Sequence, residues 1–235
     1  SVSLYFEEEP IFSCLTAAAC ATEETESVSG DSYSFLETDD SVAMILSDGV
    51  GSGESAARDS GRIVDLTERI LDAGLGPDMA MLFLNGMAGA EGDENRMATL
   101  DLCRIDLYRG ECETVKAGGA AGFIKRSDRV EKIQSRQLPL GMSASEDISE
   151  KKWQLNSGDL VILVSDGVVQ NWPCGDGEYL LEQKIASLNV SSPVDLANLI
   201  LRYAIRQCGG KIRDDMTVLV TGIWKNEERE IEDIE

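Results

Sequence analysis

Apolar residues along this chain fall mostly into short runs separated by turn-forming residues. Runs of this kind, bounded by Gly, Asp, Ser or Asn, are typical of β-strands. They predict strands over residues 42–46, 100–107, 112–117, 122–125, 130–133, 160–164 and 216–223. The segment Ser127-Asp128-Arg129 separates two of these runs and predicts a hairpin turn.

Other segments repeat their apolar residues at helical spacing. The pattern predicts helices over residues 55–71, 77–88 and 192–208. The last of these has the strongest boundary signals, because Ser192 and Asp195 fit a helix cap and Gly209 follows the final turn. Predicted strands outnumber predicted helices and are joined by short turns. That order favours an α+β fold, with antiparallel sheets and helices on their outer faces.

The chain is expected to form one domain. We find no internal repeat and no linker rich in Pro or Ser, so residues 1–225 are assigned to a single folded unit. Residues 226–235 read NEEREIEDIE and are expected to be frayed or disordered, because they are strongly acidic. The dipeptide Asp176-Gly177 follows no apolar run, and we interpret it as a simple turn.

The charge balance excludes some partners. The 235 residues include 21 Lys or Arg and 43 Asp or Glu, for a formal net charge of -22. Such a charge repels nucleic acid and anionic lipid, so neither is an expected partner. Most of the acidic residues are expected to form an ordinary solvated surface, but some carboxylates could converge to hold cations.

The chain contains no histidine, which narrows the chemistry further. A Ser-His-Asp triad, a Cys-His pair and a His-containing zinc site are therefore excluded. None of the six cysteines forms a C-x-x-C pair, so we expect reduced thiols and a cytoplasmic domain. No segment is as long and apolar as a membrane span, so a membrane anchor could lie only in segments outside this chain.

Acidic residues stand at the ends of four predicted strands. Two apolar runs lead directly into Ser-Asp-Gly and so place Asp48 and Asp166 at strand ends. Asp31 and Asp214 come just before other strands, and Asp215 stands beside Asp214. A single Asp-Gly is usually turn chemistry, but four such carboxylates in one place would repel strongly unless cations neutralised them.

A site that offers only oxygen ligands, with no imidazole or thiolate, favours hard divalent cations, Mg²⁺ or Mn²⁺. Two such ions about 4 Å apart can share a carboxylate and a bridging hydroxide. That arrangement can drive hydrolysis without any histidine.

The segments SGDSY, SDGVGSGESA, LPLGM, LVILVSDG and DDMTVLV, in this order, resemble the motifs of the PPM (type 2C) metal-dependent protein phosphatases. Within that family the chain looks most like the stage II sporulation protein E group, and then like the stress-response phosphatases that act on anti-anti-sigma factors. The resemblance covers residues 12–224. It implies a four-layer α-β-β-α sandwich and hydrolysis of phosphoserine or phosphothreonine on an anti-anti-sigma-type protein in sporulation control.

The resemblance also implies a metal role for each matching residue. Asp48 would bridge two Mn²⁺ or Mg²⁺ ions, and Gly49 would add its backbone carbonyl to one of them. Asp166 and Asp214 would complete the protein ligands of the other ion. Asp31 would help to hold the pair, either directly or through water.

Further residues are expected to support or control the site. Asp215 stands where many relatives have Asn, and the turn at Gly118 and Gly119 corresponds to a glycine turn near the site in relatives. The glycine-rich connection containing Gly51 and Gly53 leads into the first helix and could act as a hinge that couples helix position to metal occupancy.

The chain departs from many eukaryotic relatives, because it has no histidine to act as general acid and no basic residue between positions 12 and 29 to bind phosphate. Leaving-group protonation would then come from metal-bound water.

An inactive phosphatase fold that only binds or scaffolds is the main alternative. A two-metal nuclease is disfavoured by the charge, and an aspartyl-phosphate enzyme by the lack of a D-x-D motif. A homodimer is a further hypothesis.

Overall fold

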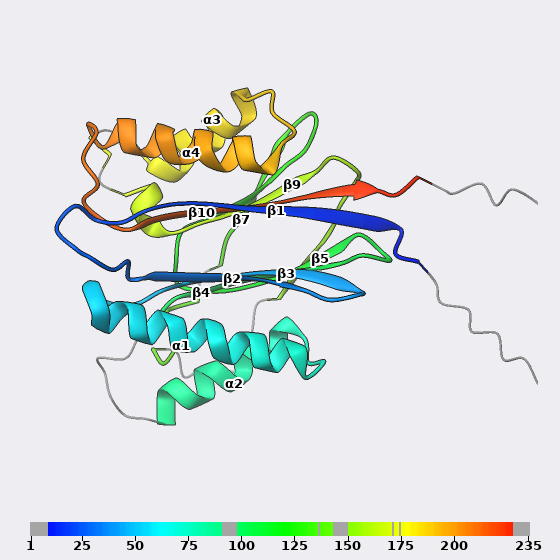
Figure 1. Ribbon diagram of the computed structural model, residues 1–235, viewed down its shortest axis with the longest axis horizontal. Coiled ribbons are helices and arrows are strands. Elements are labelled where there is room, and N and C mark those ends of the chain that lie inside the picture. The colour runs from blue at the N-terminus through cyan, green and yellow to red at the C-terminus, as the bar shows by residue number, and fades with distance from the viewer. Residues whose placement is uncertain are drawn as a thin grey trace, which may run out of the picture.

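The computed structural model describes residues 9–90, 98–135, 137–142, 150–170, 172–173 and 175–227. Within these ranges the strands form two five-stranded antiparallel sheets that pack face to face, and helices cover both outer faces (Figure 1). The layers therefore follow the order helix, sheet, sheet, helix. This confirms the α-β-β-α sandwich implied by the sequence resemblance.

The first sheet carries both described ends of the chain. Its strands lie in the order β1 (Phe12–Ala21), β10 (Met216–Lys225), β9 (Leu160–Val164), β6 (Gly122–Lys125) and β7 (Val130–Ile133). Helices α3 (Gly177–Ser187) and α4 (Pro193–Gln207) cover its outer face (Figure 1). Ser192 caps α4 by accepting a hydrogen bond from the Asp195 amide at 3.3 Å, as the sequence predicts.

The second sheet contains the strands that lead to and from the first two helices. Its order is β2 (Asp31–Glu37), β3 (Ser41–Asp48), β4 (Leu100–Asp106), β5 (Glu111–Ala117) and β8 (Lys151–Gln154). Helices α1 (Gly53–Asp72) and α2 (Pro77–Ala90) pack on its outer face (Figure 1).

The apolar run of β3 is explained by burial on both faces. Met44 and Leu46 point into the core between the two sheets. Ala43 and Ile45 alternate with them and pack toward α1 and α2. A strand covered on both sides cannot alternate between apolar and polar residues, so it appears in the sequence as a continuous apolar segment.

Several elements were not predicted from the sequence. The simple turn expected at Asp176 is wrong, because Asp176 is the cap residue of α3 and accepts a hydrogen bond from the Tyr179 amide at 3.2 Å. The apolar stripe of α3 is short, since Leu181 and Ile185 are its buried residues. Strands β1 and β8 were also missed: β1 is rich in alanine, a weak strand former, and pairs along its whole length with β10.

The two described ends of the chain lie side by side. The Asn226 amide donates a hydrogen bond to the Ile11 carbonyl, and the Asn226 side chain donates to the Pro10 carbonyl, both at 2.8 Å. Residues 228–235 of the acidic tail lie outside the described residues. Within the described ranges, no helix is both long enough and apolar enough to cross a membrane.

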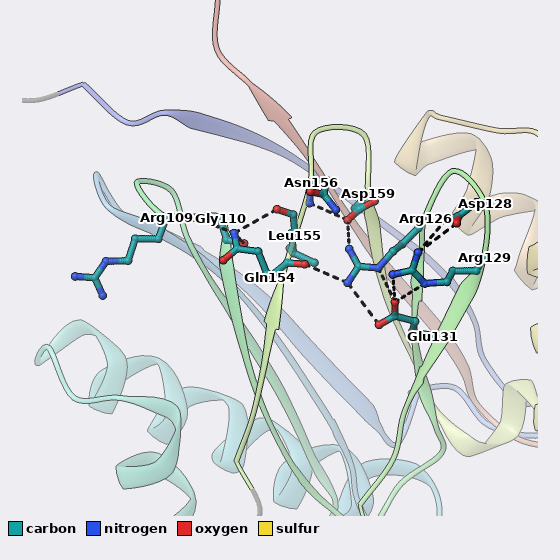
Figure 2. A network of polar contacts seen from close by, with 10 residues as sticks. All are labelled: Arg109, Gly110, Arg126, Asp128, Arg129, Glu131, Gln154, Leu155, Asn156 and Asp159. Carbon is teal, nitrogen blue, oxygen red and sulfur yellow. Dashed lines mark hydrogen bonds and ion pairs between the residues drawn. The ribbon is translucent and has the colours of Figure 1, made fainter.

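A buried arginine organises the far end of the sandwich, where β10 ends. Arg126, which is 8% exposed, contacts Asp159 at 2.5 Å and Glu131 at 2.8 Å. It also donates a hydrogen bond to the Gln154 carbonyl at 3.1 Å, while the Gln154 side chain reaches the Gly110 carbonyl (Figure 2). Acidic side chains at this end are therefore neutralised by arginine.

Candidate active site

The four predicted metal-binding acids lie at the opposite end of the sandwich, where β2 and β10 begin and β3 and β9 end (Figure 1, left). Asp31 is the first residue of β2 and pairs in register with Asp48, the last residue of β3. Asp166 begins the 3₁₀ turn η1 (Asp166–Val168) after β9, and Asp214 lies two residues before β10. The antiparallel order of both sheets thus brings the four carboxylates to one rim.

Asp48 experiences the repulsion of the other three carboxylates. Burial raises its pKa most, and the negative charges of Asp31, Asp166 and Asp214 add to this, so that the pKa rises to about 8. Burial is also the main reason why the pKa values of Asp166 and Asp214 are raised. The cluster is therefore unfavourable in its fully ionised form unless positive charge is added.

Asp31 is the most enclosed member of the cluster. Burial, with smaller contributions from Asp215 and Asp166, raises its pKa to about 7, while hydrogen bonds to the hydroxyls of Ser165 and Thr217 oppose the rise. Its Oδ2 atom is buried and has no hydrogen-bond partner among the described residues. A buried oxygen of this kind suits a cation.

Asp166 is oriented by a residue that sequence reasoning missed. The Gln170 side chain donates a hydrogen bond to Asp166 Oδ2 at 2.6 Å, and the Gln170 amide donates to the Asp166 carbonyl at 2.8 Å. The charge of Asp166 also contributes, after burial, to the raised pKa of Asp48. The only sequence signal for Gln170 is its position one helical turn after Asp166.

Thr99 holds Asp48 in place and was also missed. The Asp48 amide donates to Thr99 Oγ1 at 2.9 Å, and the Thr99 amide donates to the Asp48 carbonyl at 2.8 Å. The Ser47 hydroxyl donates to the Thr99 carbonyl at 2.7 Å. These contacts depend on the pairing of β3 with the residues before β4, which a single sequence does not reveal.

Gly49 is required by the close approach of α1. A Cβ atom at this position would lie 2.2 Å from the carbonyl oxygen of Ala56. The Gly49 amide also donates a hydrogen bond to the Gly30 carbonyl at 3.3 Å. Glycine thus lets the first turns of the helix lie directly against the end of β3.

Asp215 supports the segment that precedes Asp31. Its carboxylate is largely buried and accepts hydrogen bonds from the Gly30 amide at 2.6 Å and the Glu23 amide at 2.9 Å. These bonds tie the connection between β1 and β2 to the start of β10. This placement suits the supporting role expected of Asp215.

Gly118 and Gly119 form a turn beside Thr99 and Asp101, with φ values of 70° and 71°. A Cβ atom on Gly118 would lie 3.2 Å from Thr99 Cγ2, and one on Gly119 would lie 3.2 Å from a carboxylate oxygen of Asp101. The turn therefore packs closely against two residues near the start of β4. Both glycines are required by backbone conformation as well as by space.

An open groove of about 350 Å³ runs beside Asp166. It is lined by Gly119, Ala120, Asp166, Val169, Gln170, Asp176, Gly177 and Glu178. Backbone from the glycine turn forms part of its wall, and three of its other lining residues, Asp166, Asp176 and Glu178, are acidic. The groove meets the rim at Asp166, the member of the four-carboxylate cluster that lines it.

Gly51 and Gly53 lie between the rim and α1, with φ values of 100° and 66°. A Cβ atom on Gly51 would meet nothing within 4 Å, whereas one on Gly53 would lie 2.8 Å from a carboxylate oxygen of Glu26. The Ser52 hydroxyl donates to Glu26 at 2.9 Å and makes no side-chain cap on α1.

The donor chemistry of the rim fits divalent cations. In the part of the chain that the structure describes, no three acidic or cysteine side chains form a ready-made set of ligands for one ion. The fit rests instead on the all-oxygen donors, on the buried Asp31 oxygen that has no partner among the described residues, and on the burial and neighbouring negative charges that raise the pKa of Asp48. Asp31, Asp48, Asp166 and Asp214 are the residues that could hold such ions.

Comparison with known proteins identifies the family. The model of the family described as stage II sporulation protein E (SpoIIE) matches residues 38–223. The chain belongs to the SpoIIE family. The stage II sporulation protein E of Bacillus subtilis is 36% identical over 213 residues, which cover 90% of this chain and 26% of that protein. This chain therefore spans about a quarter of that SpoIIE protein.

Solved structures of SpoIIE agree with the fold. The PP2C phosphatase domain of B. subtilis SpoIIE with a fragment of its regulatory domain is 34% identical, with a TM-score of 0.86, and the match covers 92% of this chain and 64% of that one. The SpoIIE phosphatase domain from a crystal form without domain swapping is 32% identical, with a TM-score of 0.76, covering 94% and 97%. This chain is thus a SpoIIE-family phosphatase domain of the PP2C type, a class of metal-dependent hydrolases.

Proposed function

We propose that this domain hydrolyses phosphoserine or phosphothreonine on a small regulatory protein of the anti-anti-sigma type. The observation that carries the proposal is the convergence of four carboxylates at one rim, next to an open groove. The groove would receive the residues that flank the phosphorylated side chain. The family membership of the chain supports the same reading.

The residues at the rim would act together as ligands for two metal ions. Asp48 would be shared by two Mn²⁺ or Mg²⁺ ions, and Asp31, Asp166, Asp214 and the Gly49 carbonyl would complete their protein ligands. Ions bound there would neutralise charge on the phosphoryl oxygens and lower the pKa of a water molecule.

Two neighbouring residues would keep this arrangement in place. Gln170 would fix the orientation of the Asp166 carboxylate, and Thr99 would fix the backbone of Asp48. In the reaction a water oxygen would attack phosphorus in line, the P–O bond to the serine or threonine oxygen would break, and a proton from water would neutralise that leaving oxygen.

Related proteins support both the ions and the substrate class. A B. subtilis SpoIIE phosphatase domain presoaked with Mn is 31% identical, with a TM-score of 0.55, and matches 86% of this chain. RsbX in complex with magnesium shares the fold, with a TM-score of 0.68 at 18% identity. A relative named phosphoserine phosphatase RsbU, from B. subtilis, is 24% identical over 82% of this chain.

Charge-matched variants test the proposal. Asp48→Asn and Asp166→Asn should each lower Mn²⁺-dependent hydrolysis of a phosphoprotein or of p-nitrophenyl phosphate by more than about 100-fold. Asp128→Asn makes the same change in charge on an exposed hairpin turn at the far end, and it should leave turnover unchanged. Near wild-type turnover in either rim variant would refute the proposed site. A wild-type domain that binds the phosphoprotein without hydrolysing it would favour the binding module instead.

We also propose that the glycine connection before α1 acts as a hinge. Gly51 has open space around it but a φ of 100°, so Gly51→Ala would stiffen and strain the connection without a steric clash. We expect weaker Mn²⁺ binding in this variant. Gly158→Ala is the matched control, because Gly158 has a φ of 90°, has nothing within 4 Å and lies at the far end. Equal Mn²⁺ affinities in both variants and in the wild type would refute the hinge.

The cellular context belongs to the same proposal. We propose a cytoplasmic domain that forms a homodimer and is joined to any membrane anchor through segments outside this chain. Sedimentation of the purified domain at micromolar concentration tests the dimer, and a single monomeric species would refute it.

A further inference from the structure

A buried ion pair lies near the proposed site but is not used by it. Lys116 Nζ lies 2.5 Å from Asp101 Oδ2, and each side chain is 3% exposed. The two residues pair in register across β4 and β5, and Asp101 also pairs with Leu46, which faces the core between the sheets. Both charges are therefore held between the sheets, at the end of β4 and β5 that lies nearest to the rim.

Stabilisation of the fold does not by itself explain this ion pair. Asp101 Oδ1, the carboxylate oxygen that does not contact Lys116 at 2.5 Å, has no hydrogen-bond partner among the described residues. Removing two charges from water costs several kcal/mol per ion, and the mutual attraction of an incompletely bonded pair does not reliably recover that cost. Apolar residues of similar volume would serve packing at least as well, so the position of the pair needs another explanation.

Contacts on one side of the pair lead to the proposed site. The carboxylate of Asp101 lies directly beneath Gly119, where any Cβ would come within 3.2 Å of it. Two residues earlier, Thr99 contacts the neighbouring Gly118 and exchanges hydrogen bonds with Asp48. Gly119 in turn lines the groove beside Asp166.

We propose that Lys116 and Asp101 are positioning residues for the phosphatase site. Lys116 holds the Asp101 carboxylate against the Gly118–Gly119 turn, and the turn sets both the wall of the groove and the surroundings of Thr99 and Asp48. Neither residue touches the reacting atoms. The inference rests on the proposed function, because positioning matters only if the rim and the groove are the active site.

The test removes both charges while keeping the volume. In Asp101→Leu/Lys116→Met the buried charges are gone, so the domain is expected to fold, but the turn loses its anchor. Arg126→Met/Asp159→Leu is the matched control, since it removes a comparably buried ion pair at the far end (Figure 2). Two quantities are measured in each variant: amide hydrogen exchange of residues 118–121 without metal, and kcat and KM with Mn²⁺.

We expect the 118–121 amides of Asp101→Leu/Lys116→Met to exchange about tenfold faster or more than in the wild type, because the turn opens locally. We expect kcat to fall about 10-fold to 100-fold, with a smaller change in KM, because the ligands and the groove are displaced. The control double variant should match the wild type in both quantities.

Exchange and kcat within about twofold of wild type in the folded double variant would overturn the inference, since the pair would then be replaceable packing. If that variant does not fold, Asp101→Asn decides by the same two measurements, because it keeps the shape and removes one charge. A wild-type domain without phosphatase activity would refute the proposed function, and the exchange measurement would still decide whether the pair positions the turn.

Discussion

Acidic side chains occupy both ends of the sandwich, in opposite electrostatic settings. At the far end, Asp159 and Glu131 contact Arg126, which holds the pKa of Glu131 below its ordinary value (Figure 2). At the rim, Asp48 lies among other carboxylates and has its pKa raised to about 8. Acidic residues are thus paired with a cation at the far end, whereas at the rim they repel one another.

The contrast shows how a protein can prepare a cation site. Paired acids at the far end contribute to folding whether or not a ligand is present. The clustered acids at the rim oppose folding when they are ionised, and a cation bound at the proposed site would relieve that opposition. We therefore expect that the far end can be perturbed without changing the chemistry of the rim.

The largest expected effect comes from breaking the paired end. Arg126→Met leaves Asp159 buried without its cation and should lower the free energy of unfolding by about 3–5 kcal/mol. The rim is untouched, so kcat of the folded protein should not change. Urea denaturation and steady-state kinetics on the same sample check both statements. A large loss of kcat would show that the two ends are coupled.

The next effect is a pH dependence of the metal-free rim. The pKa values of Asp31 and Asp48 are raised from 3.8 to about 7 and about 8. Below pH 3.8 these groups are protonated in both the folded and the unfolded state, so their contribution to stability is fully present there. As pH rises toward 7 and 8, the unfolded chain ionises them first and this contribution is lost.

Urea denaturation in chelator should therefore show a free energy of unfolding that falls by about 1.4 kcal/mol per pH unit for each proton that the folded state retains. Glu131 at the far end acts in the opposite direction, because its pKa is lowered and its contribution is lost as pH falls. The double variant Asp31→Asn/Asp48→Asn should reduce the rim slope, and the remainder is expected from Asp166 and Asp214, whose pKa values are also raised by burial. A slope that is undiminished in that variant would assign the effect to groups other than Asp31 and Asp48.

A smaller change is expected from filling the space beside Asp48. In Gly49→Ala the new methyl group would lie 2.2 Å from the Ala56 carbonyl, and the displacement of α1 should cost about 1–3 kcal/mol and lower Mn²⁺ affinity. Gly61→Ala is the control inside α1, because its Cβ would make an ordinary 3.6 Å contact with the Ser32 hydroxyl. That substitution should stabilise the domain slightly through helix propensity. Calorimetric unfolding and Mn²⁺ titration distinguish the two variants.

The smallest change in stability is expected where the cation of an ion pair is exposed. Lys152 lies on β8 and contacts Glu113 at 2.6 Å and Glu111 at 3.4 Å, and its side chain is 52% exposed. Exposed ion pairs are screened by water and salt, so Lys152→Ala should leave the urea midpoint unchanged within experimental error. A clear loss of stability would show that pairing matters even without burial.

Much of the fold and of the acidic rim could be predicted, because the signals for them lie in short continuous segments of the sequence. The apolar runs before Asp48 and Asp166 marked buried strands that end in a turn, and the motif order indicated the family. Helix α3 was missed because its buried face consists of Leu181 and Ile185 alone. A short stripe of this kind does not separate a helix from a loop.

Other features depend on which strands become neighbours. Thr99 reaches Asp48, and Lys116 reaches Asp101, only through strand register. Gln170 acts on Asp166 through a local turn that hydrophobic periodicity does not signal. These contacts join residues whose individual sequence neighbourhoods are ordinary, so a single sequence gives no reason to pair them.

The pairing of β1 with β10 also has a mechanical consequence. Phe12 lies opposite Lys225, and Ala21 lies opposite Met216, so both described chain ends leave from the same end of this strand pair. A force that pulls these ends apart would open the hydrogen bonds one after another, as in unzipping, rather than load them all at once in shear. Rupture would begin at the far end and would reach Met216, beside the carboxylate rim, last.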